Sequence, residues 1–257
     1  MPLHPQPYPI LEFDDAPEAL IEPSRLIPRA DIPSRCVLCF FQEVLAALPA
    51  DHGATQVAEV RSEQGITPVY ALEVGDTSLV AAHPGVGAPL AAGILEELIA
   101  MGCDRFIVCG GAGVLRRDLV VGHPVIVTGA VRDEGTSYHY VAPSREVVAE
   151  PGPVAALEGV LRAHGVEYLA GKTWTTDAFY RETPDRVARR REEGCLTVEM
   201  EAAAFLAVAR FRGVALGQVL YSGDDVSGEV WDSRQWQDRT SVRERLFWLA
   251  AEACAAL

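Results

Sequence analysis

The fold is predicted most directly from one stretch of the chain, TVEMEAAAFLAVARFRGVALGQVLYSGDD, residues 197–225. Residues 198–211 are apolar almost all round, which predicts a helix covered by protein on every side. Gly213 is placed to end that helix, residues 214–221 read as a buried strand, and an acidic turn follows at residues 222–225. This order is typical of an α/β protein, in which ligands bind beyond the carboxyl ends of the strands.

Two glutamates, Glu199 and Glu201, stand at the start of this apolar helix. An unpaired carboxylate in such surroundings costs several kcal/mol or takes up a proton, and a helix N-terminus returns only about 0.3 to 1 kcal/mol. We therefore expect polar partners for both. Because residues two apart face roughly opposite sides of a helix, one carboxylate is expected to reach a ligand while the other bonds the scaffold. The alternative is a pair of solvated acids at a helix start.

Composition narrows the classes of partner. Acidic residues outnumber Lys and Arg by 36 to 22, which gives a net charge of −14 and disfavours nucleic acid and anionic membranes. The chain shows neither a signal-peptide pattern nor an apolar run long enough to span a bilayer, so we expect a cytoplasmic protein. Cys36 and Cys39 form a lone CxxC without companion ligands, and we predict no metal site and no cofactor.

The chain divides into an arm and one domain. Residues 1–35 hold eight of the 17 prolines and show no periodicity, which predicts an extended N-terminal arm, and residues 36–257 are expected to form a single domain. In that domain the patterns predict strands at residues 36–41, 56–60, 69–74, 78–82, 105–109, 120–131 and 168–176, and helices at residues 42–48, 89–101, 153–164, 187–193 and 239–256. Glycine turns are expected at residues 85–87 and 110–113.

Four motifs carry a family resemblance. Their order and spacing resemble those of the nucleoside phosphorylase family, which includes uridine phosphorylase and methylthioadenosine nucleosidase. The motifs are Gly85-Val86-Gly87, residues 106–113, Thr176-Asp177-Ala178-Phe179-Tyr180 and Val198-Glu199-Met200-Glu201. The chain resembles this family over about residues 70–250. The resemblance implies a three-layer α/β/α sandwich around a central mixed β-sheet, assembly into a homo-oligomer (dimer, trimer or hexamer), and cleavage of the bond between ribose C1′ and a nucleobase.

The resemblance also implies roles for single residues. The bond breaks through a cationic, oxocarbenium-like ribose, which anionic groups around the sugar stabilise. Glu201 would accept hydrogen bonds from the ribose hydroxyls, Met200 would pack under the sugar, and Glu199 would support Glu201 or face the base. Phe179 would stack on the base. Asp224 would protonate or bond the base, with Asp225 as the alternative.

Departures from the family concern the group that attacks C1′. The family's phosphate-binding positions correspond here to residues 40–44, Val108 and Gly111, which lack the expected charged or hydroxyl side chains. Backbone amides at Gly85, Gly87, Gly110 and Gly111 are expected to line this side of the site. Arg61, Arg116, Arg117 or an arginine of a neighbouring subunit are the candidate replacements for the missing cations.

A second reading comes from the nucleosidase branch. Phe41-Gln42-Glu43-Val44 resembles the segment whose glutamate activates water, which makes Glu43 a candidate general base; the alternative is an ordinary acid at a helix start. The family's uracil-binding positions correspond to Thr183 and Asp185, so uridine is disfavoured and Asp224 favours a purine-like base.

Three functions follow from these observations. The first is a phosphorylase-type pentosyltransferase that takes a nucleoside and inorganic phosphate. The second is a hydrolytic nucleosidase that uses Glu43 and water. The third is a nucleoside-binding protein that retains Glu201 without turnover. The identity of the base and the choice between phosphate and water stay open from the sequence.

Overall fold

The centre of the protein is strand β5 (Arg105–Val114), which is buried on both faces. The computed structural model describes residues 3–257, and in it Phe106 and Val108 pack into one apolar core while Ile107 and Cys109 pack into another. Such continuous burial is expected for a parallel strand covered by helices on both sides. Strands β1 (Arg35–Cys39) and β10 (Ala215–Asp225) flank β5 and run parallel to it.

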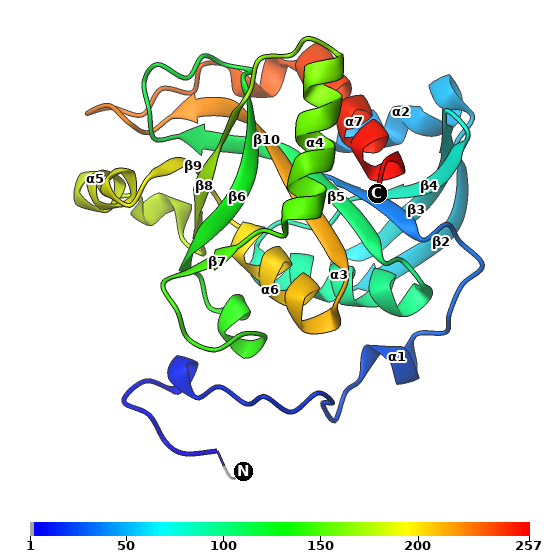
Figure 1. Cartoon of the computed structure of the whole chain (residues 1–257), viewed down its shortest axis with the longest axis horizontal. Coiled ribbons are helices and arrows are strands. Elements are labelled where there is room, and N and C mark those ends of the chain that lie inside the picture. Colours follow the sequence, from blue (N-terminus) through cyan, green and yellow to red (C-terminus); the bar gives the residue numbers. More distant parts are fainter. Residues whose placement is uncertain (1–2) are drawn as a thin grey trace.

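A ten-stranded mixed sheet extends from this centre (Figure 1). Beyond β1 come β4 (Thr77–Ala82), β3 (Gly65–Val74) and β2 (Thr55–Ser62). On the other side, β10 pairs with β6 (Pro124–Asp133), β6 with β8 (Leu169–Thr176), and β8 with β9 (Cys195–Glu199). Because β9 also pairs with β5, strands β5, β10, β6, β8 and β9 close into a ring. The short β7 (Glu146–Val148) pairs with β6.

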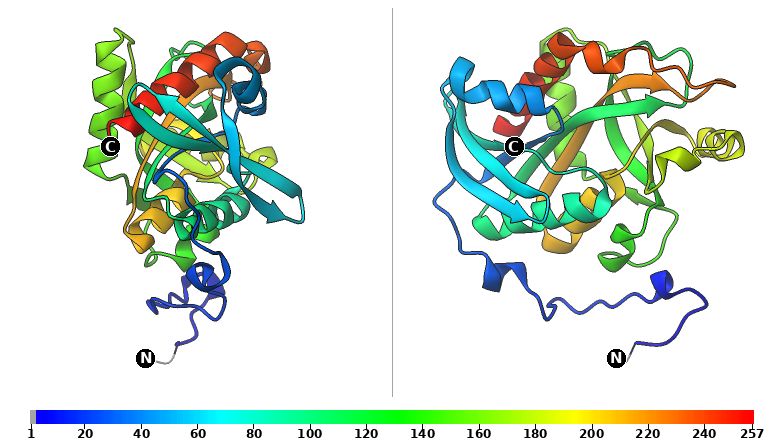
Figure 2. Two further views of the ribbon diagram at one scale, coloured as in Figure 1. Left: turned by 90° about the vertical axis from the view of Figure 1, so that its right-hand side faces the viewer. Right: turned by 180° about the vertical axis from the view of Figure 1, so that it is seen from behind.

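Helices form the two outer layers (Figures 1 and 2). Helices α3 (Ala88–Met101) and α6 (Ala202–Arg212) pack into the core that contains Phe106. Helices α2 (Gln42–His52), α4 (Pro151–Ala163) and α7 (Thr240–Ala255) pack into the core that contains Ile107. The predicted three-layer α/β/α sandwich around a mixed sheet is therefore confirmed.

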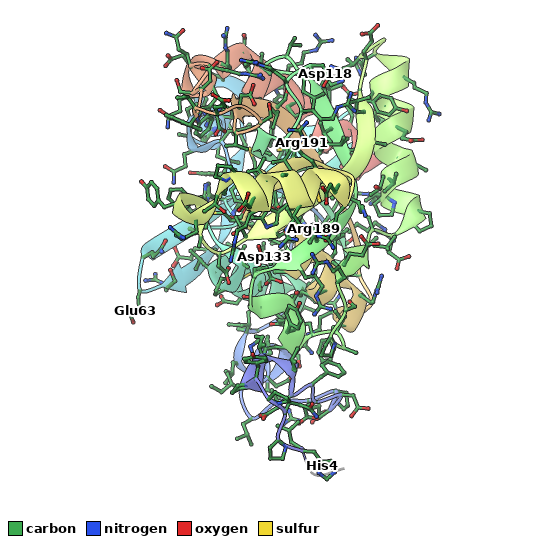
Figure 3. All side chains as sticks on the ribbon, turned by 90° about the vertical axis from the view of Figure 1, so that its left-hand side faces the viewer. His4, Glu63, Asp118, Asp133, Arg189 and Arg191 are labelled. Atoms are coloured by element: carbon green, nitrogen blue, oxygen red, sulfur yellow. The ribbon has the colours of Figure 1, made fainter. Side chains whose placement is uncertain are left out.

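One further helix, α5 (Pro184–Glu192), lies outside the layers. Its Arg189 and Arg191 project from the outer surface of the molecule (Figure 3). Arg190 is turned inward, where it donates a hydrogen bond to Asp133 at 3.1 Å, and the same carboxylate oxygen accepts a hydrogen bond from Trp174 Nε1 at 3.0 Å. Asp133 therefore joins α5 to strands β6 and β8.

Several boundaries differ from the sequence prediction. Val198 and Glu199 end strand β9, and the helix predicted from residue 198 begins at Ala202. Helix α2 continues through Pro49 to His52 and ends at Gly53, whose left-handed φ of 66° supplies the stop. The turns expected at residues 110–113 and 222–225 are wrong, because β5 continues through the glycines to Val114 and β10 continues through the acids to Asp225.

Close packing explains the glycines inside β5. A Cβ atom at Gly110 would lie 2.8 Å from the ring of Phe40, and one at Gly111 would lie 2.9 Å from the ring of Tyr221. Their absence lets aromatic side chains approach the strand backbone. Gly111 is paired with Tyr221 in the β5–β10 ladder, so its part of the chain is strand and not an open nest of amides.

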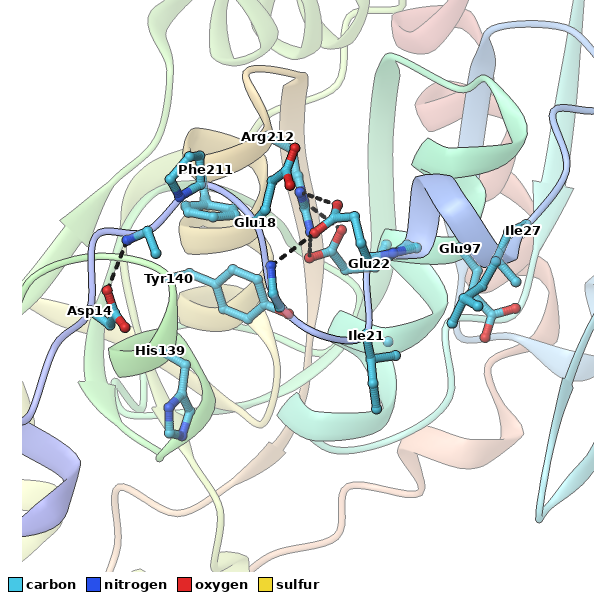
Figure 4. A pocket seen from close by; sticks show the side chains of 17 residues that line it. Asp14, Glu18, Ile21, Glu22, Ile27, Glu97, His139, Tyr140, Phe211 and Arg212 are labelled. Carbon is cyan, nitrogen blue, oxygen red and sulfur yellow. Dashed lines mark hydrogen bonds and ion pairs between the residues drawn. The ribbon is translucent and has the colours of Figure 1, made fainter. Parts of the chain in front are cut away.

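The N-terminal arm runs along one side of the domain (Figure 2). It contains the short helices η1 (Pro9–Leu11) and α1 (Pro23–Leu26), and β1 begins directly after it. Arg212 at the end of α6 holds the arm, donating to Glu22 at 2.9 Å and to both oxygens of Glu96 at 2.7 and 3.1 Å. A hollow of about 530 Å³ lies between the arm and the domain, lined in part by Glu97, His139, Tyr140 and Phe211 (Figure 4).

The cysteines are reduced and buried. Cys36 and Cys39 contribute to the two separate cores, on opposite faces of the sheet, so they do not face one another. Within residues 3–257, no group of three or more His, Cys, Asp or Glu side chains is placed to hold a metal ion. In the same part of the chain, no helix combines the length and apolar character needed to cross a bilayer.

Candidate active site

Glu199 lies where strand β9 ends and forms part of the scaffold. Its Oε2 accepts hydrogen bonds from the backbone amides of Glu201 at 2.7 Å and Ala202 at 2.6 Å, which satisfies donors at the start of α6. Its Oε1 accepts a hydrogen bond from Thr175 Oγ1 at 2.7 Å. The Thr175 hydroxyl oxygen in turn accepts from the amide of Ala203 at 3.0 Å. Three of these hydrogen bonds tie Glu199 directly to protein groups, and the fourth holds Thr175.

Glu201 occupies the N-cap position of α6, and its carboxylate points to the glycine loop that precedes α3. Its Oε1 accepts a hydrogen bond from the amide of Gly87 at 2.6 Å, and its Oε2 accepts from the amide of Met200 at 3.3 Å. The side chain is 5% exposed. Burial raises the pKa of both Glu199 and Glu201 above the ordinary carboxyl value, and the charge of Glu199 adds to the shift at Glu201. The predicted polar partners are thus present as backbone amides.

The glycine loop is held by a histidine that the sequence motifs did not single out. His83 Nδ1 accepts a hydrogen bond from the amide of Gly85 at 2.9 Å, and burial lowers the pKa of His83. Gly85 has a φ of 77°, and a Cβ at this position would lie 2.4 Å from the Leu90 side chain. Both the positive φ and the contact with Leu90 therefore require glycine at position 85. Gly87, at φ 90°, then presents its amide to Glu201.

Asp224 lies beside the end of β5. A Cβ built on Gly113 would stand 3.5 Å from both carboxylate oxygens of Asp224, and the Asp224 Oδ2 accepts a hydrogen bond from Trp231 Nε1 at 2.7 Å. Gly113 also pairs with Val198 of β9, the strand that ends at Glu199, so Asp224 lies near the end of β9. The acid is part of a cluster at the ends of β5, β9 and β10.

Asp225, in contrast, is bonded to neighbouring protein groups. Its side chain forms an ion pair with Arg234, accepts a hydrogen bond from the amide of Ser227 at 2.8 Å, and is nearly inaccessible to solvent. Hydrogen bonds with Ser227 and the charge of Arg234 hold its pKa below the ordinary value against the effect of burial. The geometry therefore separates the two acids at the end of β10: Asp225 stabilises the loop that follows, and Asp224 faces Gly113.

Phe179 lies on the short helix η3 (Phe179–Arg181), just after β8. Its ring is half exposed and stands 4.1 Å from that of Tyr180. Burial raises the pKa of the nearby Glu182 to about 7, and the charge of Asp224 contributes to this shift. Because Thr175 of β8 pairs with Glu199 of β9, η3 follows the end of β8 that lies beside Glu199. Glu182 directly follows the predicted aromatic segment, but no pattern in the sequence marked it.

Glu43 forms an ion pair with Arg243. It lies in the first turn of α2, where Arg243 Nη2 of α7 donates to its Oε2 at 2.9 Å and Arg243 Nε stands 2.6 Å from its Oε1. Two of the cations proposed from the sequence pair with acids at exposed positions, Arg61 with Glu59 and Arg116 with Asp118, and Arg117 is likewise exposed. Arg243, 200 residues from Glu43, was not predicted because no local pattern links them.

Comparison with known proteins identifies the family. Residues 34–251 match the model of the phosphorylase superfamily. The chain belongs to the phosphorylase superfamily. Within this superfamily it is 35% identical over 143 residues to a guanosine phosphorylase of Halorubrum lacusprofundi, an alignment that covers 56% of this chain and 59% of that protein. The alignment thus spans less than two thirds of that relative.

Two solved structures of superfamily proteins share the fold. A uridine phosphorylase of Vibrio fischeri superposes with a TM-score of 0.74 at 22% identity, over 90% of this chain and 95% of the other. An AMP nucleosidase of Bacteroides thetaiotaomicron superposes with a TM-score of 0.70 at 20% identity, over 87% of each chain. The family resemblance read from the motifs is confirmed, and the roles of single residues stay predictions.

Proposed function

We propose that this chain is an enzyme that cleaves the N-ribosidic bond of a nucleoside. The observation that carries the proposal is the buried carboxylate of Glu201, held by the amide of Gly87 and backed by the fully bonded Glu199. A buried carboxylate with a raised pKa at the edge of an α/β sheet is a functional-site signal. Membership of the phosphorylase superfamily supports this reading.

The proposed chemistry uses Glu201 on the sugar. As the bond between C1′ and the base nitrogen breaks, its electron pair leaves with the base, and positive charge develops on the ribose. Glu201 accepts hydrogen bonds from the ribose hydroxyls and stabilises that charge in a site from which water is largely excluded. Met200, which is partly buried next to it, packs under the sugar. Glu199 holds the start of α6 and so positions Glu201.

The base is assigned to the side of the site that carries Asp224. Asp224 donates a proton or a hydrogen bond to the departing base, and the exposed rings of Phe179 and Trp231 are available to stack on it. Trp231 orients Asp224 through the hydrogen bond between Trp231 Nε1 and Asp224 Oδ2. The acid favours a purine nucleoside as substrate, and the guanosine phosphorylase relative supports that class.

The acceptor in the leading proposal is inorganic phosphate, whose oxygen forms the new bond to C1′ while the base leaves. Relatives matched by sequence include guanosine and uridine phosphorylases, which supports phosphate as the acceptor, and the proposed reaction uses no other co-substrate. Hydrolysis is the second candidate, because Phe41-Gln42-Glu43-Val44 resembles the nucleosidase segment whose glutamate activates water. In that case a water oxygen would form the bond to C1′ and Glu43 would take its proton.

We further propose a cytoplasmic homo-oligomer as the working form, as the family resemblance implies. The arm supports self-association, because its side chains Leu20, Ile21 and Leu26 are largely exposed in the single chain. Sedimentation of the purified protein at several concentrations measures this directly, and a monomer at all concentrations would contradict it.

A panel of purine and pyrimidine nucleosides, incubated with and without phosphate, tests the proposed function. Released base is measured by chromatography, and the sugar product is identified as ribose 1-phosphate or ribose. Release that requires phosphate supports phosphorolysis, whereas release without phosphate supports hydrolysis. Binding of a nucleoside by calorimetry without release of base from any member of the panel would overturn both enzymatic proposals in favour of a binding protein.

A further inference from the structure

One cation is built into the molecule beside the proposed acceptor side of the site. Arg243 lies in the first turn of α7, the helix that lies next to α2 in Figures 1 and 2. Its side chain is only 12% exposed. A guanidinium that is largely removed from water requires an anion or several hydrogen-bond acceptors.

A chain of aromatic contacts connects Arg243 to Gly111 of β5. Its guanidinium carbon stands 4.7 Å from the ring centroid of Phe41, and that ring is 5.8 Å from the ring of Tyr221. Tyr221 covers Gly111: a Cβ on Gly111 would lie 2.9 Å from the Tyr221 ring and 3.3 Å from its hydroxyl. Burial raises the pKa of Tyr221 to about 12, and the charge of Arg243 opposes that shift. Arg243 therefore lies behind Tyr221, next to the strand end that carries Gly111.

The partner of Arg243 leaves one donor unused. Among residues 3–257 its ionic partner is Glu43, whose side chain is 41% exposed. Nη2 donates to Glu43 Oε2 at 2.9 Å, but Nε is buried and its contact with Oε1 lacks the alignment of a hydrogen bond, so Nε has no acceptor. A buried N–H without a well-aligned acceptor destabilises the arrangement. The site is therefore incomplete around the guanidinium.

The exposed Glu43 is a replaceable anion. An exposed carboxylate contributes little to an ion pair, since water solvates it well on its own. A phosphate dianion carries more charge and presents several oxygens, and the planar fork of an arginine matches two of them. Phosphate would also give Nε the acceptor that Glu43 does not supply.

We propose that Arg243 is the phosphate-binding residue of this protein and that Glu43 occupies the guanidinium when phosphate is absent. Arg243 thus replaces the side chains missing from residues 40–44, Val108 and Gly111, and it does so from the C-terminal helix. The inference rests on the proposed function for its meaning in catalysis, because phosphate is there the acceptor of the ribosyl group. Glu43 is assigned a competing role in place of water activation.

Calorimetric titration of inorganic phosphate into the protein without nucleoside tests this assignment independently of turnover. We expect the wild type to bind phosphate, Arg243→Gln to weaken binding by about 10- to 100-fold, and Arg245→Gln to leave it unchanged. Arg245 is an exposed residue of the same helix and serves as the matched control. Glu43→Gln should tighten phosphate binding, because it removes the competing charge.

Two further measurements keep the assignment decidable. If Arg243→Gln does not fold, Arg243→Lys retains the charge without the fork and should still weaken binding, while Glu43→Gln should still strengthen it. With a cleaved nucleoside at saturation, Arg243→Lys should raise the KM for phosphate more than it lowers kcat. Equal phosphate affinity in wild type and Arg243 variants would overturn the assignment, as would a wild type that binds no phosphate.

The outcomes also separate this assignment from the proposed function. Arg243-dependent phosphate binding without cleavage of any nucleoside would support the anion site and contradict the enzymatic proposal. Release of base without phosphate, lost in Glu43→Gln, would support hydrolysis and overturn the assignment of Arg243.

Discussion

Glu201 and Gly87, 114 residues apart in the sequence, are joined by a 2.6 Å hydrogen bond from the Gly87 amide to the Glu201 carboxylate. The bond links the start of α6 to the loop before α3. It fixes the position of Glu201. Glu199, the other buried acid at the start of α6, is bonded to Thr175 and to the backbone of α6. The proposed sugar-binding carboxylate is therefore positioned before any ligand arrives.

Thr175 is predicted to stabilise the scaffold beneath Glu201. Thr175→Val keeps the shape of this fully buried side chain but leaves Glu199 Oε1 and the Ala203 amide without partners. We expect the free energy of unfolding to fall by about 2 to 4 kcal/mol, measured by urea denaturation. Thr55→Val, on an exposed position of β2, is the control and should change it by less than about 0.5 kcal/mol. Equal stability of the two variants would show that the Thr175 contacts contribute nothing.

The buried acids predict a stability that falls with rising pH. Because the folded-state pKa values of Glu199 and Glu201 are raised above 4.5, the stability they contribute is fully present below that pH and is lost as the pH rises through the raised values. Each group contributes a slope of at most about 1.4 kcal/mol per pH unit. Urea denaturation between pH 5 and pH 8 should show a steeper decline for the wild type than for Glu201→Gln. Parallel curves for the two proteins would rule out a raised pKa at Glu201.

Substitution of the two acids that end β10, Asp224 and Asp225, is predicted to have opposite effects on activity and stability. Asp224→Asn should lower the rate of base release by at least about tenfold and leave the unfolding free energy nearly unchanged, because Asp224 bonds only the exposed Trp231. Asp225→Asn should lower the unfolding free energy by about 1 to 3 kcal/mol, because it weakens the buried pair with Arg234. Paired kinetic and denaturation measurements on both variants check this. The reverse pattern would assign the base to Asp225.

Local patterns predicted the buried acids, and the family resemblance predicted the layers of the fold. The apolar run that follows Glu201 predicts a covered helix, and burial of Glu199 and Glu201 follows from it. The boundary at Ala202 was missed because Val198 and Glu199 suit a buried strand as well as a helix, and the pairing of β9 with β5 and β8 decides between them. The glycines of β5 were assigned to a turn because the rings of Phe40 and Tyr221 that require them are remote in sequence.

The acceptor side of the site was beyond sequence reasoning for the same reason. Glu43 reads equally well as a water-activating base and as a helix-start acid, and its contact with Arg243 arises only when α7 packs beside α2. Residues that act across 200 positions leave no spacing to recognise. Thr175 and His83 each stand next to a recognised motif. His83 accepts a hydrogen bond from Gly85 of the motif beside it, and Thr175 donates one to Glu199 of another motif.

The central claim, that Glu201 stabilises the ribose cation, is tested most directly by the kcat of base release for Glu201→Gln. Glu229→Gln, at an exposed position, serves as the control. The substrate is the nucleoside that the wild type cleaves fastest, and thermal unfolding confirms that each variant is folded. We predict that Glu201→Gln lowers kcat by about 100- to 1,000-fold, because it weakens an interaction made in the transition state, while the control retains full activity. An unchanged kcat in folded Glu201→Gln would contradict the claim.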